Sequence, residues 1–175
     1  MKKLLFVING MARSGKDTTC NFIRDYSGHD TFIISSVDDI KEKAKIMGWD
    51  GVSKTEKDRK FLSDLKDLCT WYNDAPFNYI KGQINYFYRS LHKEIMFIHV
   101  REPQEIQKLK DTFPELKTIL VTNKNVPNIT SNSGDAGVYD YQYDYYIKND
   151  GTLEELKETA LSFINGFYED GVDEI

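Results

Sequence analysis

The chain has 175 residues, of which 40% are hydrophobic and 29% charged, a balance typical of a globular domain and not of a disordered or membrane protein. Its net charge of −5 argues against a nucleic acid polymer as partner, because proteins that bind polyanions carry a basic face. A small phosphorylated ligand is compatible with this charge, since binding one needs only a few local cations.

The first residues, MKKLLFVINGMA, resemble a secretion signal only superficially. The apolar run at 4–8 is shorter than the ~7–15 residues of a signal core, and Arg13 and Lys16 follow at once. No other segment approaches the ~18 apolar residues of a membrane-spanning helix. We therefore expect a cytoplasmic protein with no membrane partner, in which Cys20 and Cys69 form no disulfide and the histidines hold no structural zinc.

Apolar runs that predict strands alternate along the chain with segments of helical periodicity. Strands are predicted at residues 4–8, 31–35, 94–100, 118–122 and 145–148, and helices at 15–26, 37–47, about 54–72, 74–92, 104–113 and 153–168. Strands separated by helices pair in parallel through right-handed crossovers. The sequence thus predicts an α/β fold, a three-layer, doubly wound domain around a five-stranded parallel sheet.

Local signals predict several helix ends and faces. Ser36 is the expected N-cap of the second helix, and Thr152 with Glu155 predicts a capping box before the last one. Tyr145 and Tyr146 are expected to pack on the sheet, while the roles of three preceding tyrosines stay open. Two buried helical stripes are predicted, one of Phe61, Leu62, Leu65 and Leu68, the other of Ile80, Ile84, Phe87 and Leu91.

The segment INGMARSGKDTTC, residues 8–20, contains the pattern G-x-x-x-x-G-K between a buried strand and a helix. Such glycines let backbone N–H groups turn toward phosphates, and the helix N-terminus adds partial positive charge. Lys16 is expected against the β- and γ-phosphates, where it takes part in catalysis. Arg13 either contributes to this site or is an exposed loop residue. The expected ATP contacts in this loop are Gly10, Met11, Ala12, Arg13, Ser14, Gly15, Lys16, Asp17 and Thr18.

Asp17 stands where this pattern usually has a Ser or Thr, whose hydroxyl holds magnesium. A carboxylate beside a bound triphosphate is repelled unless a cation lies between them. Two interpretations stay open: Asp17 is a metal contact for Mg2+, directly or through water, or it only complements the positive end of the helix dipole.

The segment GMARSGKDTT, with Asp after the lysine, resembles the phosphate loop of the phage-type deoxynucleoside monophosphate kinases, P-loop kinases related to dephospho-coenzyme A kinase. The similarity continues in order through SSVDDIKEKAK, KDRKFLSDL with its R-x-x-L-x-x-L pattern, HVREPQEI with R-x-x-x-E, and DYYIKNDGTLEEL, a closing strand, turn and helix. It covers most of the chain, and its first and last blocks are specific by themselves.

The resemblance implies a P-loop kinase that uses ATP and Mg2+ to convert a (deoxy)nucleoside monophosphate into its diphosphate. It implies one domain over residues 1–175, with a helical acceptor-binding region at about 48–93 and a lid-like segment at about 123–144. Lys16, Asp38 and Arg101 would be catalytic, and Gly151 would lie near the donor base. Substrate contacts would come from Asp38, Lys41, Arg59, Arg101 and Glu105, with Glu105 holding Arg101 in place.

The chain departs from the family pattern at two places. His99 stands where related kinases usually have Asp, and residues 123–144 contain Lys124 but no arginine. His99 either lines the site or is a core histidine. Asp38 and Glu105 have an alternative role, since acids are favoured in the first turn of any helix, and Arg59 and Arg101 could form surface ion pairs.

Two other functions stay open besides the nucleotide kinase. One is a dephospho-coenzyme A kinase-like enzyme for another small molecule, and the other is a nucleotide-binding P-loop module without efficient catalysis. The sequence also leaves open the acceptor base, its sugar, and whether the protein forms a homodimer.

Overall fold

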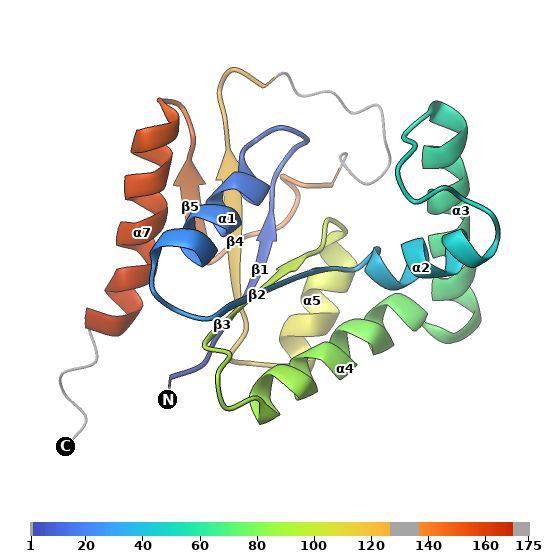
Figure 1. The fold of residues 1–175 in the computed structure, drawn as a ribbon, viewed down its shortest axis with the longest axis horizontal. Coiled ribbons are helices and arrows are strands. Elements are labelled where there is room, and N and C mark those ends of the chain that lie inside the picture. The colour runs from blue at the N-terminus through green and yellow to red at the C-terminus, as the bar shows by residue number, and fades with distance from the viewer. Residues whose placement is uncertain (1, 127–136, 170–175) are drawn as a thin grey trace. The chain divides into compact units, whose positions relative to one another are not determined.

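The computed structural model describes residues 2–126 and 137–169. The bounds of the helices and strands agree with the predicted elements to within three residues at each end (Figure 1). In chain order they are β1 (Leu4–Asn9), α1 (Lys16–Tyr26), β2 (Thr31–Ser35), α2 (Asp38–Ile46), α3 (Glu56–Asn73), α4 (Ala75–Arg89), β3 (Ile95–His99), α5 (Pro103–Thr112), β4 (Lys117–Thr122), β5 (Tyr145–Lys148) and α7 (Leu153–Glu169).

The five strands form one sheet in the order β2-β3-β1-β4-β5. β1 runs parallel to both its neighbours, β3 and β4, and β4 runs parallel to β5. All six residues of β1 are buried, as expected for a central strand covered on both faces. The predicted α/β fold with a five-stranded parallel sheet is therefore confirmed.

α1 and α7 pack on one face of this sheet, and α5 lies on the other (Figure 1). Phe6 of β1 is the centre of an aromatic group, because its ring stacks on Phe97 at 5.4 Å and meets Phe167 of α7 edge-on at 5.3 Å. Burying one such side chain is worth about 1.5–3 kcal/mol. The core therefore fixes the strand from whose end the candidate site begins.

The chain divides into two compact units, the first comprising residues 1–33 and 91–175 and the second residues 34–90. The second unit holds α2, α3 and α4. Its small core consists of Ile40, Ala44 and Leu65, with Trp49, Phe61, Leu62 and Cys69 packed against it. The helical region predicted at about 48–93 falls largely in this unit, and its role in acceptor binding stays a prediction.

The predicted capping box of the last helix is confirmed. The backbone N–H of Thr152 donates to Glu155 Oε2 at 2.6 Å, and the N–H of Glu155 donates to Thr152 Oγ1 at 3.2 Å. The same arrangement occurs at the start of α3, where Thr55 and Asp58 cap each other. Both boxes satisfy N–H groups that the first helical turn leaves without an intrahelical partner.

The Ser36 N-cap prediction was wrong. The N-cap of α2 is Val37, without a side-chain bond, and the Asp38 carboxylate instead accepts a hydrogen bond from the Ser35 N–H at 2.7 Å.

The stripe prediction was wrong for Leu68, which is 57% exposed, whereas Leu65 of the same helix is buried. It was also wrong for Leu91, which is 83% exposed because α4 ends before it. Ile80, Ile84 and Phe87 are buried as predicted. Tyr146 is exposed, whereas Tyr145 packs on the core.

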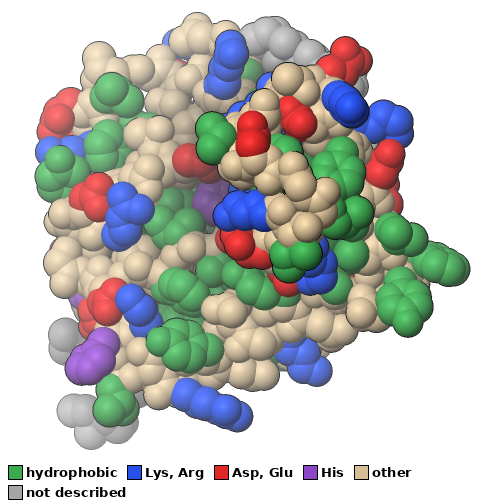
Figure 2. Space-filling view, turned by 45° about the vertical axis from the view of Figure 1, so that its right-hand side comes forward, with side chains coloured by type: hydrophobic (Ala, Val, Ile, Leu, Met, Phe, Trp, Pro, Cys, Tyr) green, Lys and Arg blue, Asp and Glu red, His purple; other side chains and the backbone are tan. Residues whose placement is uncertain are grey.

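Charged side chains of both signs are interspersed on the face shown in Figure 2. None of the helices in the described part of the chain combines the length and apolar character needed to cross a bilayer.

Candidate functional site

The candidate site begins where β1 ends at Asn9 and the chain loops over to α1. Glycine is required at both ends of this loop. A Cβ on Gly10 would collide with the Val121 carbonyl of β4, and a Cβ on Gly15 would collide with the side-chain amide of Asn149. Gly15 also has a φ of 100°, which glycine adopts far more readily than other residues. The loop therefore lies closely against the carboxyl ends of β4 and β5.

Arg13, in the middle of the loop, has a φ of 66° and is exposed. This left-handed conformation is uncommon for a residue with a side chain. Left-handed residues between right-handed ones turn successive N–H groups to one side, an arrangement that binds anions. The loop thus has the backbone features of a phosphate cradle.

Lys16 is the first residue of α1, and its side chain is only 11% exposed. The N-cap, Gly15, offers no side-chain hydrogen bond to the first turn. The positive end of the helix dipole and the full charge of Lys16 therefore both favour an anion at this end of α1. Of the other expected loop contacts, Met11 and Ser14 are buried, Thr18 is half-buried and Ala12 is exposed.

Asp17 lies beside two nitrogen-bearing side chains. Its Oδ1 is 3.9 Å from Lys16 Nζ and 3.6 Å from His99 Nδ1, and its side chain is 74% exposed. His99 therefore lies beside the loop, and its role in a functional site stays a prediction. Mg2+ in nucleotide sites is commonly held by one or two carboxylates together with phosphates and water. A single exposed carboxylate beside a phosphate loop fits that pattern. In residues 2–126 and 137–169, no cluster of three or more His, Cys, Asp or Glu side chains could hold a metal on its own.

Asn9 joins three segments that are far apart in the sequence, and sequence reasoning missed it. Its fully buried side chain accepts from the Gly10 N–H at 2.8 Å and donates to the Tyr143 hydroxyl at 2.7 Å and to the Arg101 carbonyl at 3.1 Å. Tyr143 in turn donates to the Val138 carbonyl at 2.8 Å. Burial raises the pKa of Tyr143 to about 12, although the hydrogen bond from Asn9 lowers it slightly. An Asn directly before the first glycine was the only signal that the sequence offered.

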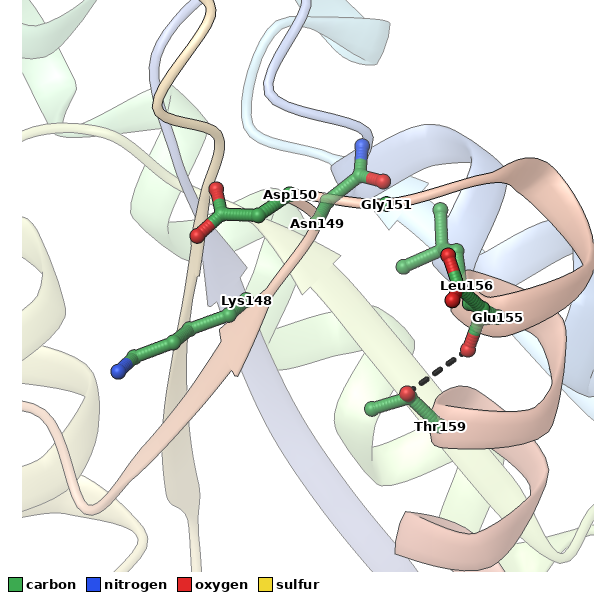
Figure 3. A pocket seen from close by; sticks show the side chains of 7 residues that line it. All are labelled: Lys148, Asn149, Asp150, Gly151, Glu155, Leu156 and Thr159. Carbon is green, nitrogen blue, oxygen red and sulfur yellow. Dashed lines mark hydrogen bonds between the residues drawn. The ribbon is translucent and has the colours of Figure 1, made fainter.

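The turn after β5 contacts the loop between β1 and α1. Asn149 Nδ2 donates to the Ser14 carbonyl at 2.9 Å, and the Lys124 N–H donates to Asp150 Oδ1 at 2.8 Å. The same turn borders an open pocket of about 360 Å³. Figure 3 shows the side chains around it, which come from the end of β5, the turn and the first turns of α7. Gly151, the predicted neighbour of the donor base, belongs to its lining.

In the second unit, two of the residues predicted to bind the acceptor substrate lie close to each other. Lys41 Nζ is 3.7 Å from Asp38 Oδ1, and both are half-buried. Burial, together with the negative charges of Asp38, Asp39 and Glu42, raises the pKa of Tyr79. Arg59 is exposed near the start of α3, where its Nε donates to the Lys54 carbonyl at 3.2 Å.

Arg101 and Glu105 belong to the first unit and follow β3. The Arg101 backbone is fixed by Asn9, and Glu105 lies in the first turn of α5. Cys20 and Cys69 are free thiols, and burial raises the pKa of Cys20 far above its usual value. Of the lid-like segment, residues 127–136 lie outside the described part of the chain.

No family model and no curated protein matches the chain. Among solved structures, it is similar to dephospho-CoA kinase from Campylobacter jejuni, with 16% identity, a TM-score of 0.55 and coverage of 98% of this chain and 100% of that one. Shikimate kinase from Aquifex aeolicus vf5 matches with 12% identity, a TM-score of 0.53 and coverage of 96% and 100%. A gluconokinase from Sinorhizobium meliloti 1021 matches with 16% identity, a TM-score of 0.50 and coverage of 95% and 94%.

The chain has a P-loop kinase-like fold. At these identities the likeness concerns the fold, while substrate and activity depend on the residues of the site.

Proposed function

We propose that the protein is an ATP-dependent phosphotransferase that acts on a small molecule, and that its acceptor is a nucleoside monophosphate, in particular a deoxynucleotide. The observation that carries this proposal is the loop from Gly10 to Lys16. Glycine is required at both its ends, Arg13 is left-handed, and a buried lysine opens the following helix. The fold shared with small-molecule kinases supports it, and the ordered resemblance to deoxynucleoside monophosphate kinases supports the choice of acceptor.

The loop supplies what phosphoryl transfer asks of a protein, namely positioning and positive charge. The loop N–H groups and Lys16 hold the donor phosphates, with Arg13 as a second cation. The donor base lies near the pocket that Gly151 borders. Asp17 holds Mg2+, which when bound neutralises charge on the donor phosphates.

The acceptor phosphate needs positive charge of its own. Arginine suits this task, because its planar fork meets two phosphate oxygens at once, and we assign it to Arg59 and Arg101. Asp38 orients the acceptor or takes its proton, and its neighbour Lys41 is a further phosphate contact. Glu105 keeps Arg101 in place.

The test is product analysis by chromatography after incubation with Mg-ATP and single acceptors. The panel contains the common nucleoside monophosphates, their deoxy forms, dephospho-CoA, shikimate and gluconate. We expect a diphosphate from one or a few nucleotides. Lys16→Ala should lower the rate at least about 100-fold, because it removes the charge at the transferring phosphate. Lys2→Ala, an exposed lysine at the amino end of β1, is the matched control and should keep full activity.

The other outcomes separate the alternatives. A phosphorylated product from dephospho-CoA, shikimate or gluconate alone would keep the phosphotransferase and replace the acceptor. ATP binding without transfer to any acceptor would favour the nucleotide-binding module. Full activity of Lys16→Ala would contradict the phosphate-loop assignment itself.

A further inference from the structure

His99 is the last residue of β3 and lies beside the phosphate loop. In the parallel pairing of β1 and β3 it is opposite Ile8, one residue before the end of β1. The other four residues of β3 are buried, whereas the His99 side chain is 17% exposed. The imidazole therefore lies largely buried at the edge of the sheet from which the loop starts.

Two nitrogens lie near one oxygen of Asp17. His99 Nδ1 is 3.6 Å and Lys16 Nζ 3.9 Å from Asp17 Oδ1. Lys16 by itself cannot hold the Asp17 carboxylate in one orientation, because bound phosphates compete for the Lys16 ammonium group. His99 is carried by a buried strand, and a side chain on such a rigid element keeps its position when a ligand enters.

An exposed carboxylate that holds a metal benefits from a neighbour that restricts its orientation. The Asp17 side chain is 74% exposed, and ordering it costs conformational entropy. Groups that orient a ligating side chain typically change metal affinity or activity about 10–100-fold. Resting on the proposed function, we propose that His99 is a positioning residue that holds the Asp17 carboxylate in place for the hydrated Mg2+ ion of bound Mg-ATP.

The first experiment measures the magnesium effect, defined as the ratio of the ATP dissociation constants without and with saturating Mg2+, by titration calorimetry. His99→Ala should lower the magnesium effect about 10-fold. Asp17→Ala should lower it as well, and the double variant should resemble Asp17→Ala, because His99 acts through that carboxylate. His99→Asn should stay close to the wild type, since its amide nitrogen takes the place of Nδ1.

His92→Ala is the matched control. This exposed histidine precedes the amino end of β3, the end opposite His99, and its removal should leave the magnesium effect unchanged. Melting temperatures of all variants without nucleotide show whether they fold. If His99→Ala does not fold, the comparison of His99→Asn and His99→Gln decides, because Gln carries its nitrogen one bond further out.

The second experiment uses Mn2+ with ATP as a paramagnetic probe and follows the ring signals of the three histidines by NMR. The His99 signals should broaden strongly, and those of His29 and His92 should not.

The inference is overturned if His99→Ala keeps the full magnesium effect, if the double variant is clearly weaker than Asp17→Ala, or if Mn2+ leaves the His99 signals sharp. Those results would leave the proposed kinase intact as long as product forms. Failure of the wild type to bind ATP under either condition would overturn both proposals.

Discussion

Arg13 has a strained backbone conformation and a charged side chain, and two substitutions can measure their effects separately. A side-chain-bearing residue in its left-handed conformation, with a φ of 66°, costs about 1–2 kcal/mol. Arg13→Gly should therefore raise the free energy of unfolding by about 1 kcal/mol while weakening ATP binding through loss of the charge. Arg13→Ala loses the same charge but keeps the strain. Urea denaturation without nucleotide and titration with ATP measure the two effects. Equal stability of both variants would contradict the strain argument.

Tyr143 should contribute to stability in a pH-dependent way. At pH 8, Tyr143→Phe should lower the free energy of unfolding by about 1–2 kcal/mol, because Asn9 Nδ2 and the Val138 carbonyl each lose a buried partner. Burial raises the folded-state pKa to about 12, while the unfolded chain titrates near pH 10. This contribution is complete below about pH 10 and is lost as the pH rises through 12.

The measurement is urea denaturation of both proteins from pH 8 to 12. The gap between wild type and Tyr143→Phe should shrink by up to about 1.4 kcal/mol per pH unit above pH 10. Tyr72→Phe, which removes the hydroxyl of an exposed tyrosine, is the control and should show no such trend. A constant gap across this range would refute the role assigned to burial.

Among the secondary-structure elements, Asp144 links the start of β5 to β4 and α5. Its carboxylate accepts from the N–H and Oγ1 of Thr118 at 2.9 Å each and from Lys110 Nζ at 2.6 Å. Burial by itself would raise the pKa of Asp144, but the hydrogen bonds from Lys110 and Thr118 outweigh it and lower the pKa. The hydrogen bonds of Asp144 therefore stabilise the folded state at pH values above about 4, which is the pKa of an aspartate in the unfolded chain. This stabilisation weakens as the pH falls below that value.

Asp144→Asn should lower the free energy of unfolding at pH 7 by about 1 kcal/mol, a modest value because about a third of the side chain is exposed. The gap to the wild type should narrow as the pH falls below about 4, as measured by urea denaturation. Asp111→Asn on α5, whose exposed carboxylate accepts one hydrogen bond from Gln107, is the control and should change stability by less than about 0.5 kcal/mol. A gap that is unchanged at pH 3 would show that the charge of Asp144 does not matter.

The elements themselves were largely predictable, because their signals are local. The first five residues of β1 are apolar because the strand is covered on both faces, and the Thr152–Glu155 box lies within four residues of sequence. The prediction that Leu68 is buried was wrong, because the spacing of apolar residues along a helix does not indicate how large a core the helix packs against. The prediction of Ser36 as N-cap was wrong, and the side chain that bonds the backbone at this helix start is that of Asp38, which accepts from the Ser35 N–H.

The contacts that shape the candidate site were not predictable from the sequence. Asn9 meets Tyr143, Asn149 meets Ser14, and His99 meets Asp17, in pairs separated by between 82 and 135 residues. Each contact depends on which strands are neighbours in the sheet and on their register, which no local pattern contains. The loop motif could be found in the sequence because its glycines and lysine lie close together along the chain. The residues that support the loop lie far from it in the sequence.

In the whole molecule, the proposed donor and acceptor residues belong largely to different compact units. Lys16 lies in the first unit and contacts Asp17, while Arg59 lies in the second and contacts the Lys54 carbonyl. The two side chains are also assigned to different ligands, Lys16 to the donor and Arg59 to the acceptor. Binding of the two substrates should therefore be separable by mutation.

Lys16→Ala should weaken ATP binding at least about 10-fold and leave the affinity for the nucleoside monophosphate unchanged, and Arg59→Ala should do the reverse. Arg59→Lys is the matched variant: it keeps the charge but lacks the planar fork, so it should bind the acceptor nearly as weakly as Arg59→Ala. Calorimetric titration of each variant with each ligand alone gives the result. If Lys16→Ala lost both ligands while remaining folded, the acceptor would share the phosphate loop, and the assignment of its phosphate to Arg59 would be wrong.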